Sequence, residues 1–122
     1  MEFRDNKAIY LQIAEYVSEN IMLGRWPGDE KIPSVRDLAI DLQVNPNTVA
    51  RAYELLQNQG IISNKRGIGF WVVSDASDKI KSQLKDRFLS QELPEFFKKI
   101  SLLNISLDEI SKRFTDFNTK KQ

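Results

Sequence analysis

The chain of 122 residues contains no cysteine and no histidine. Disulfide bonds and thiolate metal sites are therefore impossible, and the side chain that most often serves as general base or zinc ligand is missing. No apolar run approaches the roughly 18 residues that a membrane-spanning helix needs, and the first residues lack the apolar centre of a secretory signal. We therefore expect a soluble cytoplasmic protein that is not an enzyme and needs no cofactor or metal.

An excess of positive charge, the usual mark of a nucleic-acid binder, is also missing. The chain has 18 Lys and Arg residues against 17 Asp and Glu residues, a formal net charge of +1. Residues 1–74 carry a net charge of −1, and residues 75–122 carry one of +2. Any nucleic-acid interface must therefore depend on where individual cations lie, because the overall charge does not provide one.

Hydrophobic spacing and turn residues predict three helices and a hairpin in the first part of the chain. Ser34 is expected to begin the second helix as its N-cap, with a contact to phosphate as its alternative role, and Asn45 with Pro46 begins the third. We predict helices at residues 7–23, 34–43 and 45–59 and strands at residues 61–64 and 68–73. This order of elements is that of a winged helix-turn-helix.

A polar stretch at residues 74–78 marks the predicted end of the first domain. We expect a winged helix-turn-helix domain at residues 1–74 and a helical tail at residues 75–122, so the fold class is mostly α with a small β component. The tail has more apolar side chains than so short a segment can bury. We predict a homodimer interface formed by Ile80, Leu84, Phe88, Phe96, Phe97, Ile100, Leu103, Leu107, Ile110 and Phe114. The alternative is that these residues pack against the tail's own helices and the winged domain.

The start of the third predicted helix combines polar side chains that suit DNA. On a helical wheel, Asn47, Thr48 and Arg51 share the side opposite the apolar stripe. Their amide, hydroxyl and guanidinium groups hydrogen-bond to bases and phosphates, and free backbone N–H groups at a helix start attract phosphate. Two structural alternatives stay open. Asn45 to Thr48 is a good helix start in any protein, and Arg51 can pair with Glu54.

Three further cations are candidates for phosphate contacts. Lys65 and Arg66 lie at the predicted hairpin tip beside Gly67, from which they can reach a phosphate backbone or a minor groove. Arg36 lies near the positive end of the second helix, where a cation is unfavourable by itself. The alternatives are a solubilising turn at the hairpin tip and an ion pair between Arg36 and Asp37 or another acidic residue.

Three stretches resemble, in order and at matching separations, the DNA-binding domain of the GntR family of regulators. They are residues 27–39 (PGDEKIPSVRDLA), 44–53 (VNPNTVARAY) and 66–70 (RGIGF). The resemblance extends over residues 7–73, and the short helical tail is similar to that of the YtrA-like subfamily. It implies a dimeric transcription regulator, usually a repressor, that binds a near-palindromic operator in double-stranded DNA.

The resemblance also implies which positions contact DNA. The matching positions are Arg36, Asn45, Asn47, Thr48, Arg66 and Gly67. The chain departs from part of the family at Pro46 and Ala50, where some members have arginine. Arg51, one position after Ala50, is expected to replace these contacts in part.

Two other classes of function fit part of the pattern. A winged-helix adaptor that binds another protein would share the fold without the DNA contacts. An enzyme would need a site such as a metal-binding pair of Asp37 and Asp41, which share a helix face, but a solvated face is the favoured interpretation. A small-molecule effector, if one exists, would bind in a groove between subunits, because the tail is too short for a deep pocket.

Overall fold

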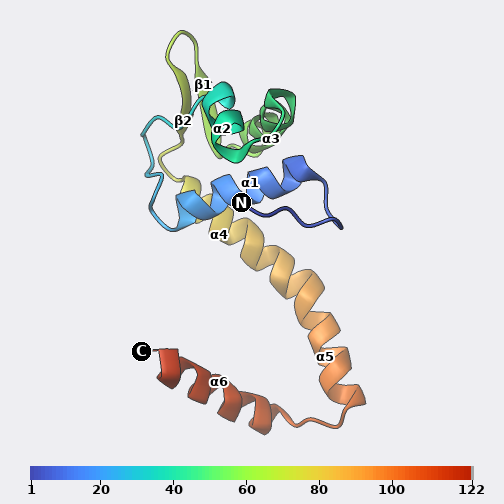
Figure 1. Cartoon of the computed structure of the whole chain (residues 1–122). Coiled ribbons are helices and arrows are strands. Elements are labelled where there is room, and N and C mark those ends of the chain that lie inside the picture. The colour runs from blue at the N-terminus through green and yellow to red at the C-terminus, as the bar shows by residue number, and fades with distance from the viewer. Residues whose placement is uncertain (122) are drawn as a thin grey trace. The chain divides into compact units, whose positions relative to one another are not determined.

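The computed structural model describes residues 1–121, which form six α-helices, one π-helical segment and two β-strands (Figure 1). The chain divides into two compact units. We call residues Met1–Gln83 the winged unit and the residues from Leu84 to Lys121 the tail unit. The domain boundary predicted after residue 74 therefore lies before this division, and residue 122 of the predicted tail lies outside the described residues.

The winged unit has the three predicted helices, and the second and third begin where the predicted capping residues place them. They are α1 (Ile9–Met22), α2 (Val35–Leu42) and α3 (Pro46–Asn58). The Ser34 side chain accepts a hydrogen bond from the Asp37 N–H at 3.0 Å, and the Asn45 side chain accepts one from the Asn47 N–H at 2.8 Å. These bonds satisfy N–H groups that have no partner inside the helix. Both predicted N-caps are confirmed.

Two antiparallel strands, β1 (Ile62–Lys65) and β2 (Gly69–Val72), form the hairpin that we call the wing. β1 has the predicted length but is shifted by one residue, and β2 is one residue shorter than predicted at each end. Lys31 bridges to Trp71 on the outer side of β2, so the segment between α1 and α2 extends the sheet. Gly67 adopts a φ of +81° at the turn, where a glycine has no steric cost. The turn extends beyond the helices of the winged unit (Figure 1).

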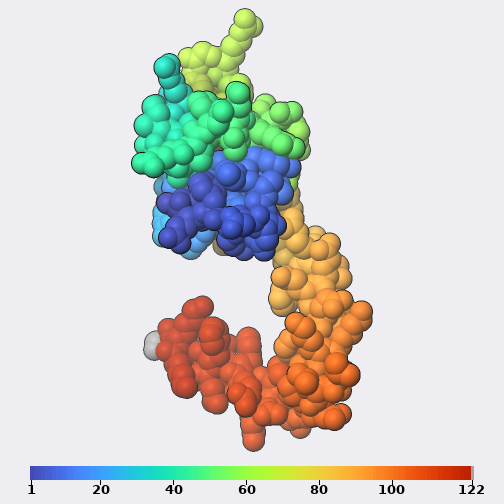
Figure 2. All heavy atoms as spheres, turned by 45° about the vertical axis from the view of Figure 1, so that its right-hand side comes forward, coloured from blue at the N-terminus to red at the C-terminus, as the bar shows by residue number. Residues whose placement is uncertain are grey.

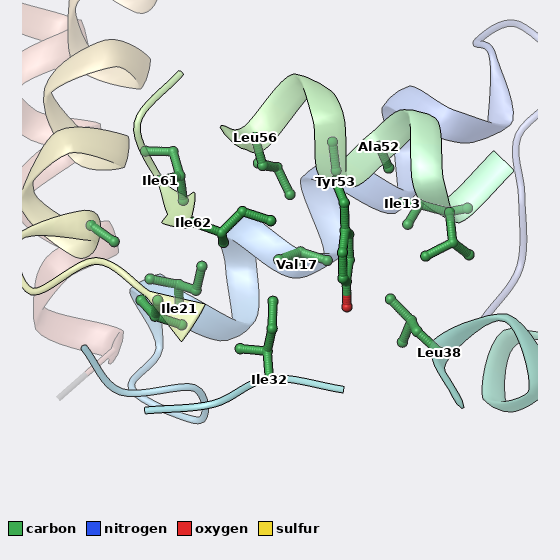
Figure 3. Close-up of a cluster of buried hydrophobic side chains, with 14 of the residues drawn as sticks. Ile13, Val17, Ile21, Ile32, Leu38, Ala52, Tyr53, Leu56, Ile61 and Ile62 are labelled. Carbon is green, nitrogen blue, oxygen red and sulfur yellow. The ribbon is translucent and has the colours of Figure 1, made fainter. Parts of the chain in front are cut away.

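The core of the winged unit is formed by side chains from all three helices and the wing (Figure 3). Tyr53 is 1% exposed and lies near Val17 and Leu38. Its hydroxyl donates a hydrogen bond to the Pro33 carbonyl at 2.7 Å, and its ring packs edge-on against Phe70. Burial raises the pKa of Tyr53, because the phenolate would lose its hydration. Tyr53 thus joins α3 to the segment before α2.

The helix α4 (Ala76–Arg87) begins in the winged unit and continues into the tail unit. Ala76 is fully buried and Ile80 is 4% exposed, and both belong to the core of the winged unit. The assignment of Ile80 to the dimer interface is therefore corrected. Ile80, Leu84 and Phe88 follow a single four-residue spacing, which by itself does not show which of them is buried. The first turns of α4 pack on the core of the winged unit, so Ile80 is buried there.

The tail unit consists of the end of α4, the π-helical segment η1 (Phe88–Glu92), α5 (Leu93–Leu102) and α6 (Leu107–Lys121). Pro94, in the first turn of α5, has no N–H and crowds the preceding turn, which explains why the helix widens there. The Ser106 side chain caps α6 by accepting a hydrogen bond from the Glu109 N–H at 3.2 Å. None of the helices within residues 1–121 has the length and apolar character to cross a bilayer.

Candidate nucleic-acid interface

The amino end of α3 presents the predicted polar side chains to solvent. Asn45, Asn47 and Arg51 are exposed, and Thr48 is half-buried. The opposite side of the helix is buried in the core through Val49, Ala52, Tyr53 and Leu56. The helical wheel therefore predicted correctly which side of α3 is free to contact another molecule.

The backbone at this end contributes less than expected. The Asn47 N–H bonds to the Asn45 side chain, and the Thr48 N–H bonds to the Asn45 carbonyl at 3.0 Å. Pro46 has no N–H. The first N–H groups of α3 are thus absent or already paired, so any DNA contact here must come from side chains. The Asn45 amide nitrogen is among them, because only the oxygen is used for capping.

These side chains border an open depression of about 430 Å³ that α3 shares with the beginning of α1. It is lined by Asn45, Asn47, Thr48 and Arg51 from α3 and its cap, and by Ala8, Ile9 and Tyr10 from α1 and its cap. The start of α1 was not among the predicted site residues. Its residues carry no local signal of binding, since only the packing of α1 against α3 brings them there.

Arg51 has an aromatic partner. Its guanidinium carbon lies 3.9 Å from the centre of the Tyr10 ring. Among the described residues, no ion pair joins Arg51 to Glu54, so that alternative is not realised. The cation–π contact restrains the guanidinium while leaving its charge in place.

The cations outside α3 lie on two other elements. Arg36 is exposed in the first turn of α2, and within residues 1–121 it forms no ion pair with Asp37. Lys65 lies at the end of β1 with its ammonium 4.1 Å from the centre of the Trp71 ring, and Arg66 is exposed at the turn. The tip projects from the surface (yellow-green in Figure 2). Ile68, which was not among the predicted site residues, is 53% exposed beside this tip.

The acidic pair on α2 gives no support to a metal site. Asp37 and Asp41 are both exposed. In the part of the chain that the structure describes, no group of three or more acidic, His or Cys side chains is arranged to hold a metal ion. The pair is a solvated helix face.

The tail unit leaves its apolar side chains uncovered. None of the residues from 84 to 121 is buried, and Phe88, Phe97 and Phe114 are 49%, 47% and 65% exposed. Except for Ile80, the predicted dimer residues are all exposed or half-buried. Three further apolar residues of the tail unit are exposed, and they are Leu89, Leu102 and Phe117. An open depression of about 660 Å³ runs beside α5, lined by Pro94, Phe97, Lys98, Ser101 and Leu102.

Known proteins are similar to this chain in both sequence and fold. The family model for bacterial regulatory proteins of the gntR family matches residues 9–72. The HTH-type transcriptional repressor YtrA from Bacillus subtilis is 34% identical over 114 residues, with 80% of this chain and 88% of YtrA covered. The crystal structure of a GntR-family transcriptional regulator from Bacteroides thetaiotaomicron is 45% identical and superposes with a TM-score of 0.83, covering 94% of this chain and 100% of that one.

The similar structures include complexes with DNA. The DNA-binding domain of AraR, solved in complex with the operator ORR3, is 30% identical and matches with a TM-score of 0.54. The match covers 60% of this chain and 86% of that one. It is therefore confined to about the length of the winged unit.

The fold and these likenesses define a class, the DNA-binding transcription regulators with a winged helix-turn-helix, and exclude the enzyme alternative. The three helices, the wing and the exposed side of α3 described above are the structural features of that class. The chain belongs to the GntR family of bacterial regulatory proteins and within it is YtrA-like. The resemblance inferred from the sequence motifs is confirmed.

Proposed function

We propose that this regulator is a cytoplasmic homodimeric repressor that binds a near-palindromic operator. The observation that carries the proposal is the exposed amino end of α3, where an amide, a hydroxyl and a guanidinium group border one depression. A helix end of this kind can enter the major groove and reach base edges. YtrA, a relative, is a repressor, and the AraR domain binds an operator.

The side chains divide between two roles in this proposal. Asn47, Thr48 and Arg51 orient the helix and discriminate between bases, supported by the Asn45 amide. Three cations attract DNA phosphates, and they are Arg36 on α2 and Lys65 and Arg66 on the wing. Each is exposed and, among the described residues, forms no ion pair. Phosphate contacts supply affinity for any sequence, whereas base contacts supply the choice of operator.

Dimerisation makes these contacts sufficient. Residues 1–74 carry a net charge of −1, so one copy binds DNA weakly. Two copies joined through their tail units bind two half-sites, and the second contact becomes intramolecular. The uncovered apolar residues of α5 and α6 support this assembly, because a chain that leaves them in water forgoes about 25 cal/mol for each Å² of apolar surface.

The first experiment selects a duplex from a random-sequence pool with the full-length protein and measures binding by fluorescence anisotropy. The mass of the free protein and of the complex is measured by analytical ultracentrifugation. We expect a symmetric selected sequence, a dimer in both states and half-sites separated by roughly 34 Å. A stable dimer that selects no sequence would contradict the proposal and favour the adaptor. A monomer that binds a single half-site would contradict the dimer.

The wing is tested by the salt dependence of binding. Replacing Lys65 and Arg66 by alanine should weaken binding to every duplex, because phosphate contacts carry no sequence information. The slope of log K against log salt should become shallower by about 1 for each lost contact. Lys81→Ala with Lys85→Ala is the matched control, because both are exposed lysines of α4 outside every ion pair among the described residues, and it should leave the slope unchanged. A loss confined to the selected duplex would contradict the phosphate assignment.

A further inference from the structure

We propose that Tyr10 of α1 is a positioning residue for DNA recognition, which holds the Arg51 guanidinium over the depression between α1 and α3. The inference rests on the proposed function, because it assigns Arg51 a contact with DNA. Tyr10 acts through Arg51 and needs no DNA contact of its own.

The geometry pairs one side chain of α1 with one side chain of α3. Tyr10 is half-buried in the first turn of α1, and its ring centre lies 3.9 Å from the Arg51 guanidinium carbon. Both residues line the depression that Asn47 and Thr48 also border. Ring and guanidinium thus meet where the polar side chains of α3 face solvent.

The chemistry of the partner explains why an aromatic ring suits this position. A carboxylate beside Arg51 would neutralise its charge and occupy its N–H donors. The face of a phenol ring attracts the cation and takes none of its five N–H groups as a full hydrogen bond. Arg51 therefore stays charged with its donors free. Glu54, one turn along α3, is the carboxylate that could have paired with it but does not.

Holding Arg51 before DNA arrives reduces the cost of binding. A free arginine side chain loses much rotamer freedom when it contacts a base, and a restrained one loses less. Only the ring is needed for this effect. Tyr10→Phe should therefore bind like the natural chain, whereas Tyr10→Leu keeps the apolar bulk and loses the effect.

The experiment uses the full-length protein with the selected duplex and a random duplex of equal length. For Tyr10→Leu we expect affinity for the selected duplex to fall about two- to fivefold per subunit, or about four- to 25-fold for the dimer. Affinity for the random duplex should change little. Tyr16→Leu is the matched control, because Tyr16 is a half-buried tyrosine of α1 whose ring contacts Trp26 instead. It should leave both affinities unchanged.

The decisive comparison repeats Tyr10→Leu in an Arg51→Ala chain. If Tyr10 acts through Arg51, the substitution has no further effect there. Equal losses in both backgrounds would overturn the inference and give Tyr10 a structural role in α1. A loss with Tyr10→Phe would overturn it in favour of a direct contact by the hydroxyl. Failure of the natural chain to select any duplex would instead refute the proposed function, and the inference with it.

Discussion

The two units of the chain differ in what they do with their apolar residues. The winged unit buries sixteen hydrophobic side chains, from Ile13 in α1 to Ile80 in α4. The tail unit buries none, although it contains four phenylalanines in α5 and α6 and one in η1. Both units have well-formed helices, and each unit contains at least one helix with a side-chain N-cap. In this chain, therefore, a segment can form helices without forming a core.

The difference indicates where each unit finds its stability. Burial of apolar surface is the dominant favourable term in folding, and short helices are only marginally stable without it. The winged unit has this term within one copy. The tail unit can obtain it only from another surface, and a second copy of the tail is the surface that the proposed dimer supplies.

The largest expected effect comes from removing the tail unit. A chain of residues 1–83 should fold as a monomer, because its core is complete. Its affinity for the selected duplex should fall by about 10²- to 10⁴-fold, since the two half-site contacts are no longer linked. Ultracentrifugation and anisotropy measure both quantities. A shortened chain that dimerises, or that keeps full affinity, would show that the winged unit holds the subunit interface.

A shorter truncation sharpens the boundary between the units. A chain of residues 1–74 lacks Ala76 and Ile80, which are both part of the winged core. Removing a buried isoleucine side chain costs about 2–5 kcal/mol. We therefore expect residues 1–74 to unfold at a lower temperature than residues 1–83 in a circular dichroism melt. Equal melting temperatures would mean that the start of α4 does not support the core.

Two leucine substitutions separate the stability of the units. Leu56→Ala in α3 should cost about 2–5 kcal/mol at any protein concentration, because Leu56 is 1% exposed. Leu103→Ala, at a position 65% exposed, should have little effect in dilute protein and lower stability only where the dimer forms. Thermal melts over a concentration series measure the difference. A Leu103→Ala effect that is independent of concentration would contradict the proposed interface.

The smallest effect concerns Tyr53 and pH. Because burial raises the folded-state pKa above the unfolded value of about 10, the unfolded chain releases the phenol proton first as pH rises. Stability from this group is therefore full below pH about 10 and is lost above it. Tyr53→Phe should not show the fall in stability at high pH that comes from ionisation of the phenol. At neutral pH it should be less stable than the natural chain by about 1 kcal/mol, because it lacks the hydrogen bond to Pro33. Urea unfolding at pH 8 and pH 11 tests this, and parallel losses in both chains would contradict it.

Local chemistry predicted much of the fold and part of the candidate site. The N-caps at Ser34 and Asn45 depend on side chains and N–H groups two or three residues apart, so they can be recognised in the sequence. The exposed side of α3 follows from helical periodicity alone. The wing turn follows from Gly67, although the ends of its strands differ slightly from the prediction.

What could not be predicted involves residues far apart in the chain. The contact of Tyr10 with Arg51 joins residues 41 positions apart and exists only because α1 packs against α3. Ile80 follows the same four-residue spacing as Leu84 and Phe88, yet it is buried in the winged core and they are exposed.

The amino-acid sequence by itself determined the order of the elements, the N-caps of α2 and α3 and the apolar side of α3, because these depend on interactions within one or two helical turns. It also determined the family, through motifs in the right order. Only the tertiary structure decided which apolar residues form a core and which stay uncovered, and which ring meets Arg51. Those outcomes depend on how separate elements pack, since burial and cation–π contacts require surfaces that are brought together by the whole fold.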